Sequence, residues 1–299
     1  MELNELVRKR FCDSEGLQKQ LATFAGQPAV FSPSPPDDKM SGWKENVHYP
    51  RIVFNYDMQA SEERNSAGTL SVVLVCQNTA DVVPELIEPE IRKCLKDVLL
   101  NTSGGPLYAF AWSRTEAFEL QKGSGVGQQG SNEILIGSEI RFDILEYAGQ
   151  ETLDPDPVMA VSDFVKKMYP DCVVVGIDRM KEVTEASKDR PVVYCRLEGV
   201  TKAEETNSVV WMDGRVAIHF LCPDSEKRMK MAAAVANRMS LSGEIIMLDH
   251  SPMRITRLQA SYRSDYLKDG QVFVTGRFGL LRFRAEGHRV VGIKNSLFT

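Results

Sequence analysis

Apolar and polar residues alternate in four extended segments of the chain, which fall into two pairs. The first pair lies within residues 49–78 and reads YPRIVFNYDM then GTLSVVLVCQ; the second lies within residues 190–224 and reads RPVVYCRLEGV then VVWMDGRVAIHFLC. Each pair opens on a proline, contains an acidic turn (EERNS or EETNS), and ends on a cysteine, Cys76 or Cys222. Alternation interrupted by a turn predicts a β-hairpin in each pair.

Each predicted hairpin is followed by a segment with the periodicity of an amphipathic helix. These segments are residues 84–100, PELIEPEIRKCLKDVLL, and residues 225–241, SEKRMKMAAAVANRMSL, where Ser225 is placed to cap the start. The predicted apolar stripes are Ile87, Ile91, Cys94, Leu95 and Val98 in the first helix and Met229, Ala232, Ala233, Ala236 and Met239 in the second.

Two more strand candidates follow each helix, and another helix precedes each hairpin. The strands read YAFAWSRTEAFEL and EILIGSEIRFDILEY in the first copy, and MRITRLQASY and QVFVTGRFGLLRF in the second. The preceding helices lie within residues 4–25, where the apolar stripe is interrupted near Asp13 to Gly16, and within residues 156–170.

The repeated order predicts an α+β fold of two tandem modules. Each module is helix, strand, strand, helix, strand, strand, with a mainly antiparallel sheet packed by helices. We interpret this as an internal duplication; two unrelated small domains that share an element order are the alternative. Pro155 and Pro157 interrupt the joining segment. They place the boundary near Thr152, giving domains 1–151 and 152–299.

The first copy carries an extra loop, SPSPPDDKMSGWKENVHYP, at residues 32–50. Its proline density favours an extended excursion on the surface over a packed element. We expect Trp43 within it to be exposed unless the loop folds back onto the module.

Composition narrows the class of protein. Of the 299 residues, 43% are hydrophobic and 26% charged, with a formal net charge of -5, so neither disorder nor unspecific binding of nucleic acid through a basic surface is supported. The six cysteines are dispersed without a CxxC pair, which favours buried free thiols in a reducing compartment. No signal peptide or membrane-spanning run is recognisable, and we expect a soluble protein of the cell interior, or one assembled there.

The glycine-rich segment QKGSGVGQQGSN, residues 121–132, has the composition of a phosphate-binding loop. A dinucleotide site needs G-x-G-x-x-G between a strand and a helix. Here Gly123, Gly125, Gly127 and Gly130 depart from that spacing, and a strand pattern follows. We therefore predict a flexible hairpin tip, with a polar counterpart near residues 262–270 of the second copy.

Other candidate chemistry is weak. His219 and Cys222 lie three residues apart on one predicted strand, so alternation would place them on opposite faces. The aromatic stretch YAFAW, residues 108–112, lacks interleaved basic residues, so core packing is favoured over base stacking. The carboxylates that could act in pairs lie in predicted turns and the linker: Glu62, Glu63, Glu204, Glu205, Asp154 and Asp156. We predict no catalytic, cofactor-binding or metal-binding residue and no cofactor, which favours an assembly protein over an enzyme.

The first copy resembles the tail terminator, or tail-completion, proteins of long-tailed bacteriophages. The resemblance covers residues 15–148 and is carried by GLQKQLATFAGQPAVF, the proline-containing loop, YPRIVFNYDM, GTLSVVLVCQ, PELIEPEIRKCLKDVLL and the two closing strands. The second copy looks like a diverged copy that lacks the proline-rich loop.

This resemblance implies a virion protein of the tail or neck, assembled in the host cytoplasm. Such proteins form six-fold rings on the last ring of the tail tube, stop its growth, contact the neck or connector, and perform no chemistry. The doubled module leaves two arrangements: six chains in two layers, which we favour because the copies have diverged, or three chains in a pseudo-six-fold ring. Expected partners are the chain itself, the tube protein, the neck or connector protein and, in a contractile particle, the sheath protein; DNA would only pass through the lumen. We expect no membrane partner. A stopper or head-completion protein and, remotely, a cytosolic α+β enzyme are the alternatives.

Three segments are candidates for subunit contacts. They are the proline-rich loop around Trp43, the glycine-rich tip, and the C-terminal segment EGHRVVGIKNSLFT, which could add onto a neighbour. The apolar residues of that last segment are Val290, Val291, Ile293, Leu297 and Phe298.

Overall fold

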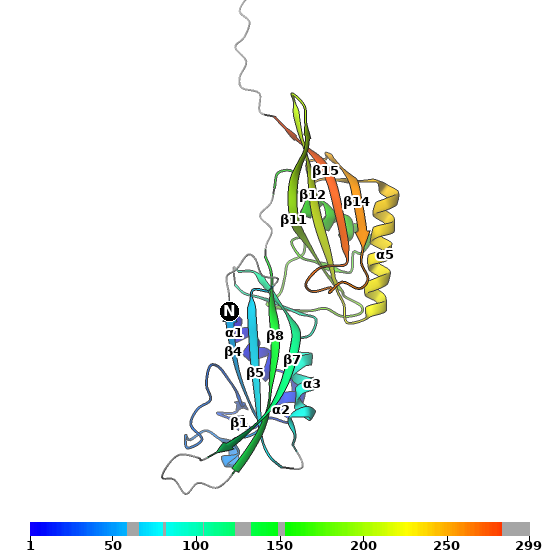
Figure 1. Cartoon of the computed structure of the whole chain (residues 1–299). Coiled ribbons are helices and arrows are strands. Elements are labelled where there is room, and N and C mark those ends of the chain that lie inside the picture. The colour runs from blue at the N-terminus through cyan, green and yellow to red at the C-terminus, as the bar shows by residue number, and fades with distance from the viewer. Residues whose placement is uncertain (59–65, 80–81, 104, 123–132, 149–152, 283–299) are drawn as a thin grey trace, which may run out of the picture.

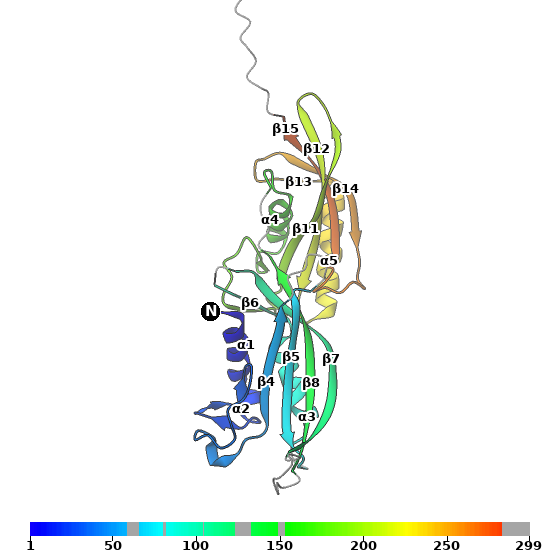
Figure 2. The same cartoon turned by 60° about the vertical axis from the view of Figure 1, so that its left-hand side comes forward.

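The computed structural model describes the chain except residues 59–65, 80–81, 104, 123–132, 149–152 and 283–299 (Figure 1). Two modules follow one another along the long axis of the molecule, each with its own sheet and its own helices, and the same arrangement is seen from a second direction (Figure 2). The first module contains α1 to α3 and β1 to β8, and the second contains α4, α5 and β9 to β15.

The larger sheet has seven strands in the order β10-β6-β7-β8-β5-β4-β3. Six of these strands come from the first module: β3 (Val30–Phe31), β4 (Arg51–Met58), β5 (Gly68–Gln77), β6 (Val98–Asn101), β7 (Leu107–Lys122) and β8 (Glu133–Tyr147). The helices of this module are α1 (Leu3–Cys12), α2 (Glu15–Gln18) and α3 (Pro84–Leu95), with a 3-10 turn η1 (Lys44–Asn46), and β1 (Thr23–Phe24) pairs with β2 (Gln27–Pro28) in a small separate sheet.

The second module has a six-stranded sheet in the order β13-β14-β15-β12-β11-β9. Its strands are β9 (Val173–Val174), β11 (Val192–Glu205), β12 (Val209–Leu221), β13 (Glu244–Ile246), β14 (Pro252–Ala260) and β15 (Val272–Leu281), and its helices are α4 (Pro157–Met168) and α5 (Ser225–Ser242). One further strand of this half of the sequence, β10 (Val183–Glu185), belongs to the larger sheet instead.

The two modules share one topology. Without β10, the order β6-β7-β8-β5-β4-β3 matches β13-β14-β15-β12-β11-β9 strand for strand. In both modules the short first strand pairs in parallel with the next long strand, β3 with β4 and β9 with β11, whereas the remaining pairs are antiparallel. The predicted α+β fold with two tandem, mainly antiparallel modules is confirmed.

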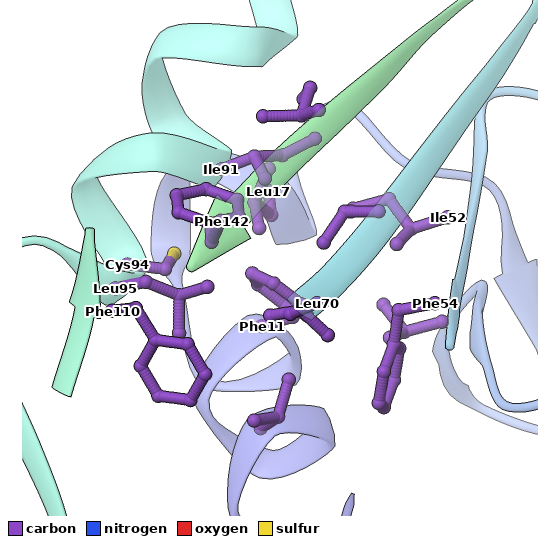
Figure 3. Close-up of a cluster of buried hydrophobic side chains, with 14 of the residues drawn as sticks. Phe11, Leu17, Ile52, Phe54, Leu70, Ile91, Cys94, Leu95, Phe110 and Phe142 are labelled. Atoms are coloured by element: carbon purple, nitrogen blue, oxygen red, sulfur yellow. The ribbon is translucent and has the colours of Figure 1, made fainter. Parts of the chain in front are cut away.

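Helices cover one face of each sheet and close a separate core over it. In the first module, side chains from α1, α2 and α3 and from β4, β5, β7 and β8 point toward one another (Figure 3). The apolar residues of α1 recur every three to four positions and so lie on one face of the helix. Leu6, Val7 and Phe11 of this face are buried in the core. The second core is formed by α4 and α5 over the other sheet.

Three details of the predicted helices are wrong. Helix α3, which follows the first hairpin, ends at Leu95 and does not continue to Leu100. Val98 begins strand β6 instead, because Asp97 turns the chain with a φ of 56°. Helix α5 is capped by Asp224, whose carboxylate accepts from the Lys227 amide at 3.0 Å, rather than by Ser225. Met229 was expected on the buried stripe of α5 but is 47% exposed. The buried face of α5 is Met231, Ala232, Val235, Ala236 and Met239.

The proline-rich loop folds back onto the first module. Trp43 is only 7% exposed and packs with Ala22, Ala29, Phe31 and Phe24. Its ring lies 5.0 Å from that of Phe24, centroid to centroid, and its indole N–H donates to the Asp37 carbonyl at 3.3 Å. The Trp43 side chain therefore anchors the loop internally and is not exposed for a partner.

The other candidate contact segments fall outside the described residues. These are the glycines at 123, 125, 127 and 130 and the C-terminal residues Val290, Val291, Ile293, Leu297 and Phe298. Strands β7 and β8 remain paired as far as Lys122 and Glu133, so the glycine-rich segment joins two antiparallel strands, as predicted, and not a strand to a helix.

Candidate functional site at the junction of the two modules

A strand, an apolar cluster and several buried polar side chains meet where the two modules join. Strand β10, in the connection between β9 and β11, pairs antiparallel with β6 of the first module. The second module thus adds a strand to an edge of the first module's sheet, and the unpaired edge of β6 is covered. The predicted boundary near Thr152 falls in residues 149–152, outside the described residues, and β10 shows that the sheets do not divide strictly at that point.

An apolar cluster joins the modules beside this strand. Its first-module residues are Leu99, Leu107, Ala109, Ala111, Leu145 and Tyr147, and its second-module residues are Val173, Ala186, Val192, Tyr194, Leu221 and Leu267. The first set lies on the face of the sheet opposite the helices, because neighbouring residues such as Leu100 and Phe110 point into the first core. Each sheet therefore buries both faces near the junction.

Two tyrosines at the centre of the cluster stack on each other. The rings of Tyr147 and Tyr194 are 4.4 Å apart, centroid to centroid, and nearly parallel at 8°. The Tyr147 hydroxyl donates to the Leu267 carbonyl at 2.9 Å, and the Tyr194 hydroxyl donates to the Ala148 carbonyl at 3.1 Å. Each hydroxyl thus reaches across to the other module, so the stack also fixes the relative rotation of the modules.

His219 is buried against the same two rings, at 5.6 Å from Tyr147 and 5.5 Å from Tyr194. Its Nδ1 lies 2.9 Å from the Tyr266 carbonyl, which can only accept, so this nitrogen carries the proton. Burial lowers the pKa of His219 to about 4, because the imidazolium would lose its hydration. The Sγ of Cys222 instead faces the Ser187 carbonyl at 3.6 Å, and the two side chains do not form a nucleophile and base pair.

The loop between β14 and β15, the counterpart of the glycine-rich tip, docks on the first module. The Tyr266 hydroxyl donates to the buried Asp97 carboxylate at 2.5 Å, and Lys268 pairs with Asp143 at 2.6 Å. The Arg228 guanidinium lies over the Tyr266 ring at 4.1 Å. Burial and the neighbouring Asp97 carboxylate raise the pKa of Tyr266, so this phenol remains a donor over the physiological range.

Two of the candidate acid-base residues, Glu205 and Asp156, have structural partners. Glu204 and Glu205 lie at the end of β11 rather than in a turn, and Glu205 pairs with Lys202 at 2.6 Å and with Arg282. Asp156 caps α4 by accepting from the Val158 amide at 2.8 Å. Asp154 is exposed in the segment before α4, whereas Glu62 and Glu63 lie outside the described residues.

The described part of the chain contains no activated thiol and no group of side chains that could bind a metal ion. Burial raises the pKa of Cys76 and of Cys195 to about 12, which keeps both as thiols at neutral pH. All six cysteines are free, and no group of three or more His, Cys, Asp or Glu side chains among the described residues could hold a metal ion.

The aromatic stretch at 108–112 divides between the core and the surface. Phe110 is buried in the first core, as predicted, but Trp112 is 46% exposed with the Arg92 guanidinium 3.8 Å from its ring centroid. Thr115, further along β7, fixes Trp112 as well, since the indole N–H donates to the Thr115 hydroxyl at 3.1 Å.

The sequence predicted none of the junction contacts. Tyr147 and Tyr194 stand near the ends of β8 and β11, and Tyr266 stands in a loop, where a tyrosine is equally consistent with an exposed position. The signal that could have pointed to them is the short apolar run on both faces of β8 and β11 near the junction, since a half-buried strand would alternate.

Comparisons of the chain with protein-family models, with curated proteins and with solved structures find no match. In the described residues, no helix is both long and apolar enough to cross a membrane. The shared topology of the two modules and the junction between them are therefore the structural features that bear on function.

Proposed function

We propose that the chain is a ring-forming structural protein of a phage tail or a phage-tail-like particle, in which each subunit spans two tiers. Its role would be that of a tail terminator, which caps the tail tube and joins it to the neck or connector. The observation that carries this proposal is the junction itself, which stacks two modules of one topology end to end in a fixed orientation.

The two modules point in the same direction along the molecule. In the second module, the β14–β15 loop is at the end that contacts the first module, and the β11–β12 turn is at the far end (Figure 1). In the first module, Tyr147 of β8 is at the contacting end, so the far ends of β7 and β8 are directed away from the second module. The subunit therefore has two different ends, as a protein between two different partners requires.

The length of two strands in the first module also supports a subunit that spans two partners. Strands β7 and β8 contain 16 and 15 residues and are well above the usual length of about five or six. Their paired ends at Lys122 and Glu133 lie at the end of the first module away from the second, where they could contact the tube. The opposite end, formed by the β11–β12 hairpin, would then face the neck.

The end-to-end arrangement favours six chains over three. A pseudo-six-fold ring of three chains needs the two modules in equivalent positions side by side around the axis, with a similar contact on each flank. Here the contact joins the end of the first module that carries Tyr147 to the end of the second module that carries the β14–β15 loop. It buries a continuous apolar cluster. Six chains with the modules in two layers satisfy this geometry directly.

The described residues form no recognisable group of catalytic side chains, which is compatible with an assembly role. The negative net charge of the chain also supports a tail protein. A net charge of -5 suits a channel through which DNA passes without binding. A ring whose lumen is lined by basic residues would count against the proposal.

The experiment is to incubate the purified full chain with polymerising tail-tube protein and to measure tube lengths and tube ends by electron microscopy. A terminator should cap one end and limit the length at substoichiometric amounts, and its rings should contain six chains by mass. Binding to portal-side proteins with no effect on the tube would identify a connector instead. A monomer at high concentration that binds a nucleotide tightly, with no effect on tubes, would revive the enzyme alternative.

A further inference from the structure

A concentration of positive charge lies at the outer side of the junction, in a chain that is negative as a whole. A cleft of about 500 Å³ opens between the C-terminal end of α1 and the segment from β9 to Arg190. Its charged lining consists of Lys9, Arg10, Arg179, Lys181 and Arg190 against Asp13 and Glu185.

Most of these cations form no salt bridge with a described residue, although the charge of Arg190 also acts on Asp178. Arg10 pairs with Glu185 at 2.5 Å and donates from Nε to the Cys94 carbonyl at 2.8 Å. Lys9, Arg179, Lys181 and Arg190 are exposed and form no ion pair with any described residue. Like charges held at one cleft repel one another, so an anion bound there would relieve an unfavourable arrangement.

The floor of the same cleft contains an open strand edge. Val183, Thr184 and Glu185 form β10, which is the terminal strand of its sheet in the described part of the chain. The Asn101 amide donates to the Glu182 carbonyl and the Ala186 amide donates to the Asp97 carbonyl.

This register fixes which main-chain groups remain free. Hydrogen-bonded pairs alternate along an antiparallel ladder, so Thr184 is bonded to β6, and the amide and carbonyl groups of Val183 and Glu185 point away from it. An extended segment could pair with those groups and continue the sheet.

We propose that this edge is the docking site of an extended acidic peptide segment from a partner protein. The strand edge supplies main-chain hydrogen bonds, and the surrounding lysine and arginine side chains receive carboxylates that project from the added strand. The occupant is not the chain's own C-terminal segment, because residues 283–299 carry Arg284, Arg289 and Lys294 against Glu286 alone. The site does not depend on the ring proposed above.

The lining also argues for a peptide over a nucleic acid. The cleft contains no aromatic side chain on which a base could stack; Val173 and Val183 are its apolar lining residues. A lone phosphate group would use the cations but leave the strand edge unused. A strand with acidic side chains uses both features of the site.

The test is fluorescence anisotropy of the full chain with a labelled ten-residue peptide in which glutamate alternates with valine. We expect saturable binding that weakens with salt. Binding should weaken at least tenfold in the double variant Arg179→Gln, Lys181→Gln. The control variant Lys167→Gln, Lys230→Gln loses the same charge from exposed positions on α4 and α5 and should bind as the unmodified chain does.

Two further measurements separate strand addition from plain charge attraction. A peptide with proline in place of each valine has the same charge but lacks alternate amides, and it should bind several-fold more weakly. The variant Val183→Pro removes an outward amide of β10 without removing a bond to β6, and it should weaken the valine peptide but not the proline peptide. Equal binding of the two peptides, no effect of the double variant, or tighter binding of a single-stranded oligonucleotide of equal charge would each overturn the proposal.

Discussion

Tyr147 of the first module and Tyr194 of the second stack at 4.4 Å, and each donates its hydroxyl proton to a main-chain carbonyl of the opposite module. Leu267 accepts the first bond and Ala148 the second. The packing of the junction and the relative orientation of the modules therefore depend on the same two side chains. Substitutions of these tyrosines should uncouple the modules and leave the core of each module folded.

Tyr194→Ala should destabilise the chain by about 3–5 kcal/mol, the usual cost of truncating a buried aromatic side chain. We expect urea unfolding, followed by circular dichroism and tyrosine fluorescence, to split into two transitions as the modules lose their coupling. Tyr194→Phe keeps the stack and should cost only about 1 kcal/mol. Tyr262→Ala, at a position that is 52% exposed, is the control and should stay within about 0.5 kcal/mol. A single unshifted transition for Tyr194→Ala would contradict this role.

His219 predicts a loss of stability in mild acid. Its pKa is about 4 in the folded chain, below the ordinary value of 6.5, so the unfolded state binds the proton more readily. The contribution is complete above pH 6.5 and declines as the pH falls toward 4, by about 3 kcal/mol in total. The free energy of unfolding at pH 7.5 and at pH 5 measures this slope.

The matched variants are His219→Gln, which should flatten the slope, and His250→Asn, which removes an exposed histidine and should leave it unchanged. Asparagine suits position 250 because the backbone there has a φ of 66°. A slope that survives in His219→Gln would assign the acid sensitivity to other groups.

The start of α5 offers a direct comparison between adjacent residues. Asp224→Ala removes the side chain that accepts from the Lys227 amide and also pairs with Lys188 at 2.9 Å, and it should cost about 1 kcal/mol. Ser225→Ala, at the position the sequence predicts as the cap, should change stability by less than about 0.5 kcal/mol. Thermal unfolding of the two variants checks this, and a larger loss in Ser225→Ala would reverse the assignment.

Thiol labelling should distinguish Cys12 from the other cysteines. Cys12 is half-buried, whereas Cys76, Cys94, Cys172, Cys195 and Cys222 are buried. In the native chain at pH 8 we expect alkylation to begin at Cys12 and the remaining five thiols to react only as fast as the chain opens. Mass spectrometry of peptides gives the order, Cys12→Ser should remove the early phase, and labelling in urea should modify all sites.

Deleting the residues after Arg282 should impair assembly but not folding of the monomer. Arg282 follows β15, donates its amide to the Ser208 carbonyl and pairs with Glu205. The described residues of both cores all precede it, so we expect the cores to survive the cut. Mass in solution and tube capping measure assembly, and urea unfolding measures stability. Normal rings from the truncated chain would exclude the C-terminal segment as a subunit contact.

Long periodic elements could be predicted from the sequence because their burial is local. The interrupted helix ending at Cys12, the start of α4 at Pro157 and the long strands of the hairpins all follow from patterns within one segment. The short strands could not, since β3, β6, β9 and β13 contain only two to four residues, too few for an alternation to be recognised.

The misjudged positions share a tertiary cause. Trp43 is buried because a loop closes over β1 and β3, Val98 leaves the helix because Asp97 adopts a positive φ, and β10 becomes a strand because β6 offers an edge. Each depends on a partner distant in sequence. The candidate site was missed for the same reason, because its tyrosines and cations come from both modules.

The cover that β10 and Tyr194 provide has a consequence for the chain during synthesis. All of the first module leaves the ribosome before Val183, so the β6 edge and the apolar face around Leu107 and Leu145 are without their native cover during that interval. A nascent first module is thus open to pairing with another nascent chain, and the time of that exposure is set by the translation of the next few dozen codons.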